Sequence, residues 1–328
     1  MKNDILFEDA EAVLKAVDLT SLDGANILVT GATGLLGTNF LASLCLLKES
    51  GKNIKVTGQY HSAPADFTLE IVQRGSFILT RGIPFIADVV IHAGCYAQPT
   101  LFTANAVDTL QQNTEVTHRL LRNLSTGGKF LFISSGEVYS GLGKPTANES
   151  DIGTTTPQHP RSCYIEGKRC GEAIVDAYRQ VGVKANSARL ATAYGPGTRK
   201  NDLRAMNQFI QQALVEKRID LKFSGFDART FCYIGDAIVM LWQICLKGKQ
   251  GIYNVGGNTF TNMADVAYEI ANITDADLTI PGNSEMLGSP KGVRMDISRY
   301  ETEFGKRDFV CLDQGLPRAI EWQRGLYQ

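Results

Sequence analysis

The sequence lacks any marked excess of charge of one sign. Its 328 residues include 33 Lys plus Arg against 34 Asp plus Glu, which gives a formal net charge of −1. Such a chain has no general electrostatic attraction for nucleic acid or an anionic membrane, so we expect neither as a partner. The length suits one large domain or two modest ones, and 44% hydrophobic residues are typical of a globular protein.

Paired cysteines and long apolar runs are also missing. The seven cysteines are odd in number, and none stands in a C-x-x-C motif. Most lie among apolar residues, as in "LASLCLL", so we interpret them as buried thiols in a reducing compartment. No apolar run approaches the ~18 residues of a membrane helix. "MKNDILFEDAEAVLKAV" lacks the basic start and apolar core of a signal peptide. We therefore expect a cytoplasmic chain, and we predict no metal site.

Buried strands and helices alternate along residues 26–195. "ANILVT", "NIKVTGQY", "DVVIHAG" and "KFLFISSGEVYS" are typical of strands, and residues 35–47 have helical spacing. "NAVDTLQQNTEVTHRLLRNLSTGG" predicts one long helix, and "CYIEGKRCGEAIVDAYRQVG" predicts another. This alternation indicates an α/β protein with a doubly wound parallel sheet of the Rossmann type. Such sheets bind ligands at the carboxyl ends of their strands.

The predicted organisation has three parts. Residues 1–25 form an N-terminal extension, residues 26–195 a dinucleotide-binding domain, and residues 196–328 mainly a smaller, mixed α/β substrate-binding domain. Within 229–257 the chain partly returns to the first domain, because "GIYNVGG" is typical of a strand. "LKFSG" is interpreted as a short strand, and residues 61–85 fit no clear pattern.

A glycine motif, "VTGATGLLG", follows the first predicted strand and opens a helix. Gly31 permits the tight turn, Gly34 lets the backbone approach a pyrophosphate, and Gly37 lets the helix pack close to the strand. The amino end of the helix adds a partial positive charge for an anion. The motif therefore predicts a dinucleotide site.

The end of the second strand leaves the cofactor open. An Asp or Glu about 20 residues past the glycines would bind the ribose of NAD. Residues 59–62 are instead Gln, Tyr, His and Ser, and Asp66 comes late. Uncharged polar groups tolerate the 2′-phosphate of NADP better than a carboxylate does. Arg74 and Arg81 would add positive charge if they folded back toward this point.

Tyr164 stands four residues before Lys168 in "RSCYIEGKRCGEA". On a helix these two side chains share a face. An ammonium group beside a phenol favours phenolate, so the pKa of Tyr164 is expected below its usual value of ~10. The pair then suits proton transfer, although an ordinary surface helix would show the same spacing.

Five motifs appear in one order: the glycine motif, "HAG" at 92–94, Asn113, "SSGEVYS" and the pair Tyr164 and Lys168. Together they resemble the extended short-chain dehydrogenase/reductases, NAD-dependent epimerases, dehydratases and decarboxylases of nucleotide sugars. "PRSCYIEGKR", "ARTFCYIGDAI" and "NDLRAMNQFIQQAL" look most like the UDP-glucuronate decarboxylase group. The resemblance implies NAD or NADP as cofactor, a nucleotide-diphosphate sugar as substrate, and a homodimer.

The resemblance also implies catalytic roles. Tyr164 would take a proton from a sugar hydroxyl, expected at C4, as hydride leaves for the nicotinamide. Lys168 would bind the nicotinamide ribose, and Ser135 would hydrogen-bond the reacting oxygen. Glu137 would serve as acid or base once the ring carries a ketone. Gly136 stands where 4,6-dehydratases carry Asp, and it cannot protonate a leaving hydroxyl.

Two sets of contacts follow from the resemblance. Arg204 and Arg229 align with family arginines that hold phosphate or carboxylate, and Arg161 is a third candidate. The implied cofactor contacts are Gly31, Thr33, Gly34, Leu35, Leu36, Gly37, Gln59, His61, Ala93, Gly94, Asn113, Ser134, Tyr164, Lys168 and Ala191. The implied substrate contacts are Tyr96, Ser135, Gly136, Glu137, Tyr194, Arg204 and Arg229.

The leading hypothesis is oxidation of a sugar hydroxyl followed by decarboxylation, as in the UDP-glucuronate decarboxylases. A 4-epimerase or 4-keto-hexose reductase would use the same Tyr164, Lys168 and Ser135 without needing a sugar carboxylate. A dinucleotide-binding protein without turnover is the third possibility, and it would have no use for the Tyr–Lys pair.

Overall fold

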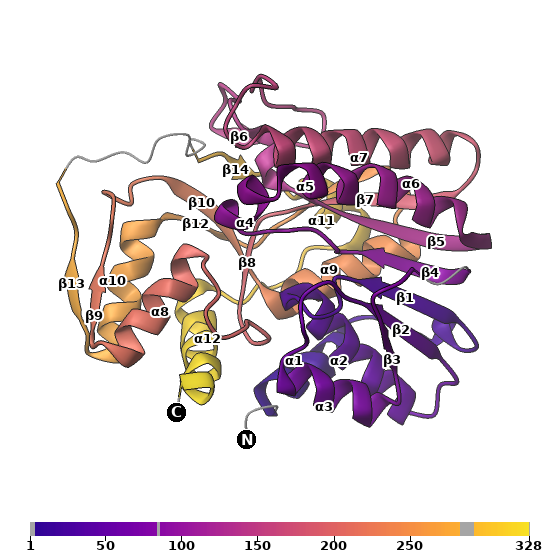
Figure 1. Cartoon of the computed structure of the whole chain (residues 1–328), viewed down its shortest axis with the longest axis horizontal. Helices are drawn as coiled ribbons and strands as arrows, with labels where there is room; N and C mark the ends of the chain where they lie inside the picture. The colour runs from indigo at the N-terminus through magenta and orange to yellow at the C-terminus, as the bar shows by residue number, and fades with distance from the viewer. Residues whose placement is uncertain (1–3, 84–85, 283–291, 328) are drawn as a thin grey trace.

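The main sheet has seven parallel strands in the order β11-β7-β5-β4-β1-β2-β3 (Figure 1). A computed structural model describes residues 4–83, 86–282 and 292–327. The strands are β1 (Asn26–Thr30), β2 (Lys55–Gln59), β3 (Ile78–Thr80), β4 (Ala87–His92), β5 (Leu124–Ser135), β7 (Lys184–Leu190) and β11 (Ile252–Val255). Strand order reverses between β1 and β4, so a ligand crevice is expected at their carboxyl ends. The predicted Rossmann-type fold is confirmed.

Helices cover both faces of this sheet (Figure 1). On one face lie α1 (Asp4–Ala16), α2 (Leu35–Glu49), α3 (Asp66–Gly75) and α9 (Ile234–Lys247). On the other lie α4 (Pro99–Ala104), α5 (Ala106–Asn113), α6 (Glu115–Arg122) and α7 (Ser162–Gln180). Because both faces are covered, β1 and β4 are almost wholly buried and consist mainly of apolar residues.

The single long helix predicted before "KFLFISS" is wrong. It is two helices, α5 and α6, separated at Thr114, whose backbone leaves helical geometry with φ −114° and ψ −75°. The Thr114 hydroxyl donates to the carbonyl of Leu110 at 2.8 Å. Residues 124–128 belong to β5, where a register shift and Gly127, at φ +78°, interrupt pairing with β4. Pattern alone could not show that this glycine lies in a strand irregularity.

Two segments without a clear sequence pattern are part of the folded core. Residues 61–83 contain α3 and β3, and residues 84 and 85 lie outside the described part. The N-terminal extension forms α1, which packs on α2 and α9. In α1, Asp9 accepts hydrogen bonds from the hydroxyl of Tyr233 at 2.7 Å and from Arg318 at 2.8 Å. The extension is therefore anchored by buried polar contacts.

Most of the remaining elements lie beside the carboxyl ends of the main strands (Figure 1). A three-stranded sheet contains β8 (Thr192–Tyr194), β10 (Ala228–Tyr233) and β12 (Thr259–Asn262). Two short pairs join β9 (Arg218–Asp220) to β13 (Asp277–Thr279) and β6 (Thr146–Ala147) to β14 (Arg294–Met295). The helices are α8 (Ala205–Val215), α10 (Met263–Thr274), α11 (Ser298–Phe304) and α12 (Leu312–Tyr327), with short 3₁₀ turns η1 (Thr20–Leu22) and η2 (Gly136–Tyr139).

Strand predictions in this second region had mixed outcomes. "GIYNVGG" does return to the main sheet, since β11 pairs with β7. "LKFSG" is not a strand; the strand is β9, which ends just before it. The predicted boundary between residues 195 and 196 stays a prediction.

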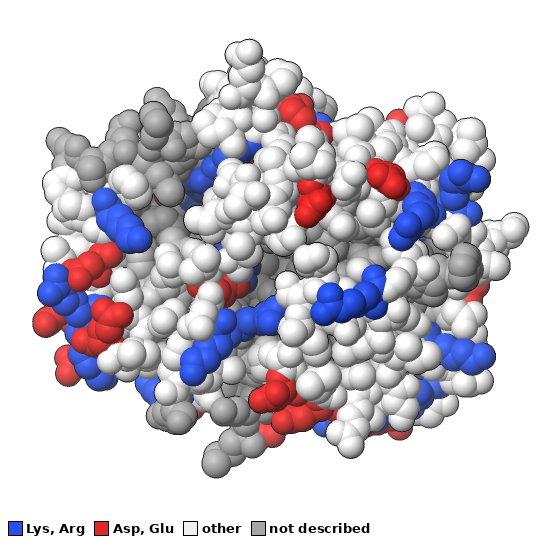
Figure 2. Space-filling view, viewed as in Figure 1, with Lys and Arg blue, Asp and Glu red and all other residues white. Residues whose placement is uncertain are grey.

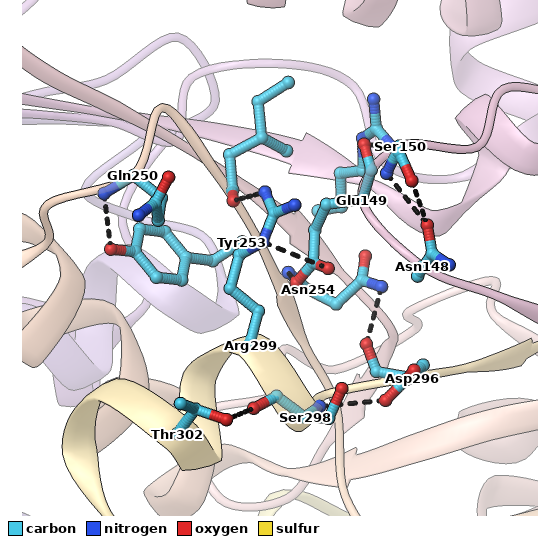
Figure 3. A network of polar contacts seen from close by, with 12 residues as sticks. Asn148, Glu149, Ser150, Gln250, Tyr253, Asn254, Asp296, Ser298, Arg299 and Thr302 are labelled. Atoms are coloured by element: carbon cyan, nitrogen blue, oxygen red, sulfur yellow. Dashed lines mark hydrogen bonds and ion pairs between the residues drawn. The ribbon is translucent and has the colours of Figure 1, made fainter.

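A network of polar contacts joins the segments around Glu149 and Asp296 to β11 of the main sheet (Figure 3). Glu149 accepts the backbone N–H of Asn254 at 2.8 Å and lies 3.5 Å from Nε of Arg299. The Asn254 amide donates to the Asp296 carbonyl at 2.8 Å. Next to Asp296, the sulfur of Met295 lies 2.9 Å from where a Cβ on Gly136 would stand. The network thus fixes the backbone around η2.

Within the described residues, none of the helices has the length and apolarity needed to cross a membrane. The same part of the chain holds no group of three His, Cys, Asp or Glu arranged to bind a metal. Four of the seven cysteines are buried, whereas Cys170 and Cys311 are exposed.

Candidate active site

One large cleft, with a volume of about 1510 Å³, runs along the carboxyl ends of the main strands. It exceeds the space that one drug-sized ligand occupies, so it has room for a dinucleotide and a second molecule. On the face shown in Figure 2, cationic and anionic side chains are both present. All predicted site residues except Asn113 line the cleft. Those that do are Gly31, Thr33, Gly34, Leu35, Leu36, Gly37, Gln59, His61, Ala93, Gly94, Tyr96, Ser134, Ser135, Gly136, Glu137, Tyr164, Lys168, Ala191, Tyr194, Arg204 and Arg229.

The glycine turn between β1 and α2 forms one wall of the cleft. Gly31 has φ +66°, and a Cβ there would lie 2.6 Å from the carbonyl oxygen of Ala93. A Cβ on Gly37 would overlap the Gly31 carbonyl oxygen. A Cβ on Gly34 would meet only that oxygen, at 3.4 Å. Gly31 and Gly37 are therefore required by backbone packing, whereas Gly34 leaves open space, as a pyrophosphate cradle needs.

Asn113 is the predicted site residue that does not line the cleft, because it is buried behind the cleft wall. Its side-chain amide donates to the Thr109 carbonyl at 2.7 Å and to the sulfur of Cys95 at 3.1 Å, beside Gly167 of α7. The structure does not bring it to the wall. Ser134 lines the cleft, but its hydroxyl donates to Glu172 at 2.5 Å. This hydrogen bond directs the Ser134 hydroxyl toward the buried Glu172.

Neither of the two arginines proposed to fold back toward β2 lines the cleft. Arg74 does not reach the cleft, because it pairs with Glu49 at 2.5 Å and stacks on Phe7. Arg81 lies over the ring of Tyr60, 5.4 Å from its centroid, at the end of β3.

Tyr164, Ser135 and Lys168 meet where α7 crosses the end of β5. The Tyr164 ring stacks on Phe102, with centroids 4.6 Å apart. The Ser135 hydroxyl lies close enough to the phenol to lower the pKa of Tyr164. Lys168 donates to the Ile133 carbonyl at 2.7 Å, and its Nζ lies 5.5 Å from the Tyr164 ring centroid. The predicted juxtaposition is therefore present.

The phenol of Tyr164 does not have the acidity that the sequence predicted. Burial raises the pKa of Tyr164 above its ordinary value, and this effect outweighs the lowering by Ser135 and by the charge of Arg204. Burial also lowers the pKa of Lys168. The Lys168 ammonium points its hydrogen bond at a backbone carbonyl rather than at the phenol. Phe102, which sequence reasoning missed, supplies part of this burial from a separate helix.

Glu137 and Arg161 form an ion pair on the cleft wall, with 2.7 Å between Nη1 and Oε1. The other carboxylate oxygen of Glu137 is buried and has no hydrogen-bond partner among the described residues. An unsatisfied buried oxygen is costly and calls for a functional explanation. The sequence suggested Arg161 as a contact for a substrate anion, whereas the structure pairs it with Glu137.

The other two candidate arginines also have protein contacts. Arg204 binds Asp202, with Nη2–Oδ2 at 2.9 Å and Nε–Oδ1 at 3.0 Å. Arg229 donates to the Ala228 carbonyl at 2.7 Å; burial lowers its pKa, and the charge of Glu137 opposes that lowering. Tyr194 lies deep in the wall, with its ring edge-on to Tyr233.

His92, which the sequence suggested is structural, is fully enclosed. Its Nδ1 lies 2.7 Å from the Thr30 hydroxyl and its Nε2 lies 2.9 Å from the Gln112 carbonyl oxygen. Burial and the charge of Lys168 lower the pKa of His92 to about 3. The imidazole is therefore neutral, and it links Thr30, at the end of β1, to the Gln112 carbonyl of α5.

Residues 27–256 match the model of the NAD dependent epimerase/dehydratase family. The chain belongs to this family. Family membership confirms a nicotinamide dinucleotide cofactor, and the glycine turn, with its open side at Gly34, fits one. It also confirms that the chain is an enzyme of the extended short-chain dehydrogenase/reductase type.

Named relatives in this family span most of the chain. UDP-glucuronic acid decarboxylase 6 of Arabidopsis thaliana is 28% identical over 90% of this chain and 88% of its own length. UDP-glucuronic acid decarboxylase 1 of Xenopus tropicalis is 26% identical over 93% of this chain and 74% of its own length.

Solved structures also resemble this chain along most of its length. The UDP-glucuronic acid 4-epimerase of Bacillus cereus, in complex with UDP-glucuronic acid and NAD, is 26% identical, has a TM-score of 0.75, and aligns over 92% of this chain and all of its own. Epimerase Mth375 of Methanothermobacter thermautotrophicus has a TM-score of 0.80 at 18% identity, which shows the fold.

Proposed function

We propose that the chain oxidises a hydroxyl, at C4, of a nucleotide-diphosphate sugar, and that it acts as a UDP-glucuronate decarboxylase. The named relatives support this substrate class, since they include UDP-glucuronic acid decarboxylases. The observation that carries the proposal is the meeting of Tyr164, Ser135 and Glu137 in one cleft beside the glycine cradle.

The cofactor would be held by the turn at Gly31, Gly34 and Gly37, with Lys168 on its ribose. When bound, NAD supplies the hydride acceptor and later returns the hydride. Tyr164 would take the hydroxyl proton in its phenolate form, which burial disfavours and which the Ser135 hydroxyl and the charge of Arg204 favour, and Ser135 would orient the reacting oxygen. A general base of this kind contributes about 10²–10⁴-fold to the rate.

Glu137 would act in the second step. Once C4 is a ketone, the C5 carboxylate is β to a carbonyl and leaves as CO₂, and the electrons of the broken bond form an enolate. A proton must then be added to C5. Glu137, fixed by Arg161, would handle that proton, because one of its oxygens makes no hydrogen bond within the described protein. Gly136 offers no acid to expel a hydroxyl, which disfavours dehydration.

The direct test is incubation with UDP-glucuronate and NAD while CO₂ is collected. We expect CO₂ release, and we expect Glu137→Gln to reduce its steady-state rate by at least about a hundredfold while hydride transfer remains, because an enolate that is not protonated blocks further turnover. Glu166→Gln is the matched control, because Glu166 pairs with Arg169 on the same helix and does not line the cleft. Equal CO₂ release by E137Q and E166Q would refute the assigned role.

A 4-epimerase or 4-keto-sugar reductase is the second candidate. The B. cereus UDP-glucuronic acid 4-epimerase aligns with nearly the whole chain at 26% identity, and the same Tyr164 and Ser135 would serve. Conversion of UDP-glucuronate to its C4 epimer without CO₂, or reduction of a 4-keto sugar by NADPH, would replace the first candidate. Nucleotide binding without turnover of either would indicate a non-catalytic protein.

We also propose a cytoplasmic homodimer formed through α5 and α7. These helices pack side by side, and α5 exposes Val107 and Leu110, at 68% and 40% of their surface. Light scattering on the purified protein should give twice the chain mass, and Val107→Lys with Leu110→Lys should give one chain mass. A wild-type monomer would contradict the dimer.

A further inference from the structure

The adenosine end of the cleft has no carboxylate where β2 ends. Gln59 closes β2, and His61 and Ser62 follow it on the cleft wall. Five acids line the cleft elsewhere, and none comes from β2, β3 or the segment between β2 and α3. Asp66, the first acid after β2, begins α3 and does not line the cleft.

Arg199 brings a cation to this end from the far side of the cleft. It lies on the wall together with His61 and Ser62, and its Nη2 donates to the Ala63 carbonyl at 2.7 Å. That bond ties the loop after β8 to the segment after β2. Arginine presents five N–H donors in a fork that matches phosphate oxygens.

A second arginine, Arg81, directly follows β3 next to this end but does not itself line the cleft. Its guanidinium lies over the Tyr60 ring, and its carbonyl accepts a long hydrogen bond, 3.4 Å, from the Gln59 amide. The end of β2 is therefore flanked by arginines from two separate elements. Sequence spacing indicated Arg81 but not Arg199, which is 140 positions from Gln59 in the chain and comes close only in the folded cleft.

In dinucleotide-binding folds an acid at this position accepts the ribose 2′-hydroxyl, and an arginine nearby accommodates a 2′-phosphate. A glutamine can serve both ligands. Its carbonyl oxygen accepts from a hydroxyl, and its NH₂ group donates to a phosphate. A carboxylate would repel the phosphate, which carries negative charge near neutral pH.

We propose that this cleft binds NADP(H) as well as NAD(H), with the 2′-phosphate held by Arg199 beside Gln59. The inference concerns only the adenosine end, so it stands or fails independently of the sugar chemistry proposed above.

The test is a pair of fluorescence titrations of the purified protein with NADPH and with NADH. We expect the two dissociation constants to agree within about tenfold. Gln59→Glu should raise the NADPH-to-NADH ratio of dissociation constants at least about a hundredfold, because it places like charges together. Arg199→Gln should raise the ratio about tenfold. Arg74→Gln, the matched control at an arginine held by Glu49, should leave the ratio unchanged.

Use of a ratio separates recognition from folding, since a misfolded variant loses both ligands. Competition adds a second readout: 2′,5′-ADP should displace NADH at least as well as 5′-AMP does. A wild-type ratio above about a thousand would overturn the proposal. So would ratios that are equal in wild type, Q59E and R199Q, or a failure of 2′,5′-ADP to displace NADH.

Discussion

Replacement of Gly37 by alanine should destabilise the whole chain. A Cβ there would overlap the Gly31 carbonyl oxygen and stand 2.5 Å from Cα of Ala32 and 2.7 Å from its carbonyl carbon. All three are backbone atoms of the turn, so relief requires α2 to move away from β1. Overpacking of a core costs about 1–3 kcal/mol. Because no flexible side chain can yield, we expect the upper end, about 3 kcal/mol.

Gly34→Ala is the matched variant. Its Cβ would meet one atom at 3.4 Å, an ordinary contact, and its φ of −85° suits alanine. An N-cap change from glycine costs only a few tenths of a kcal/mol to about 1 kcal/mol. The methyl group would nevertheless occupy the open side of the turn, where a pyrophosphate approaches. We therefore expect near-wild-type stability and nucleotide affinity lowered at least about tenfold.

Two assays separate these effects. Urea unfolding followed by fluorescence of the buried Trp242 and Trp322 gives the free energy of unfolding. Titration with NADH gives affinity for the folded protein. Wild-type stability for G37A would show that the turn is not packed as described. Wild-type NADH affinity for G34A would show that the dinucleotide does not lie on this turn.

Three further predictions concern the base, a buried ion pair and an acid-sensitive hydrogen-bond acceptor. Tyr164→Phe should slow substrate oxidation by about 10²–10⁴-fold without loss of NADH binding, whereas Tyr178→Phe should be silent; an active Y164F would remove the base. Glu172→Gln leaves Arg189, 2.7 Å away, without its buried partner, so the free energy of unfolding should fall by about 3–5 kcal/mol in urea; a change below about 1 kcal/mol would contradict this. Hydrogen bonds from Ser125 and Asn26 lower the pKa of Asp88, so its stabilisation is present above about pH 4 and is lost below it; Asp88→Asn should flatten the acid dependence of urea unfolding, and an unchanged pH profile would count against it.

The sequence predicted best what depends on neighbouring residues. The strand–glycine–helix order and the four-residue spacing of Tyr164 and Lys168 are local, and both are found as expected. The predicted length of the helix before β5 was wrong, because no local pattern marks the break at Thr114 and because the strand irregularity at Gly127 depends on pairing with β4. Local patterns carry little information about such register shifts.

The charge state of the site could not be predicted in the same way. The four-residue spacing puts an ammonium near a phenol, but it does not show that Phe102 and the cleft wall desolvate both. Desolvation disfavours the charged form of each group, and here it outweighs the attraction that the spacing suggested. The partner of Arg161 was likewise hidden, since Glu137 lies on a different element.

The two halves of the site meet because α7 can approach β5 closely. One half consists of Tyr164 and Lys168 on α7 with Arg161 at its N-cap, and the other half, Ser135 and Glu137, is where β5 passes into η2.

That approach depends on small residues of α7. A Cβ on Gly171 would overlap the Phe132 ring, and one on Gly167 would lie 3.3 Å from the Asn113 amide. With α7 packed this closely, Asn113 lies behind the cleft wall and the Lys168 Nζ lies 2.7 Å from the Ile133 carbonyl oxygen. The glycines in "YIEGKRCGEA" therefore have the same role in the catalytic helix as Gly37 has in the cofactor turn. Because they lack a Cβ, the helix can pack closely enough to bring the reacting groups together.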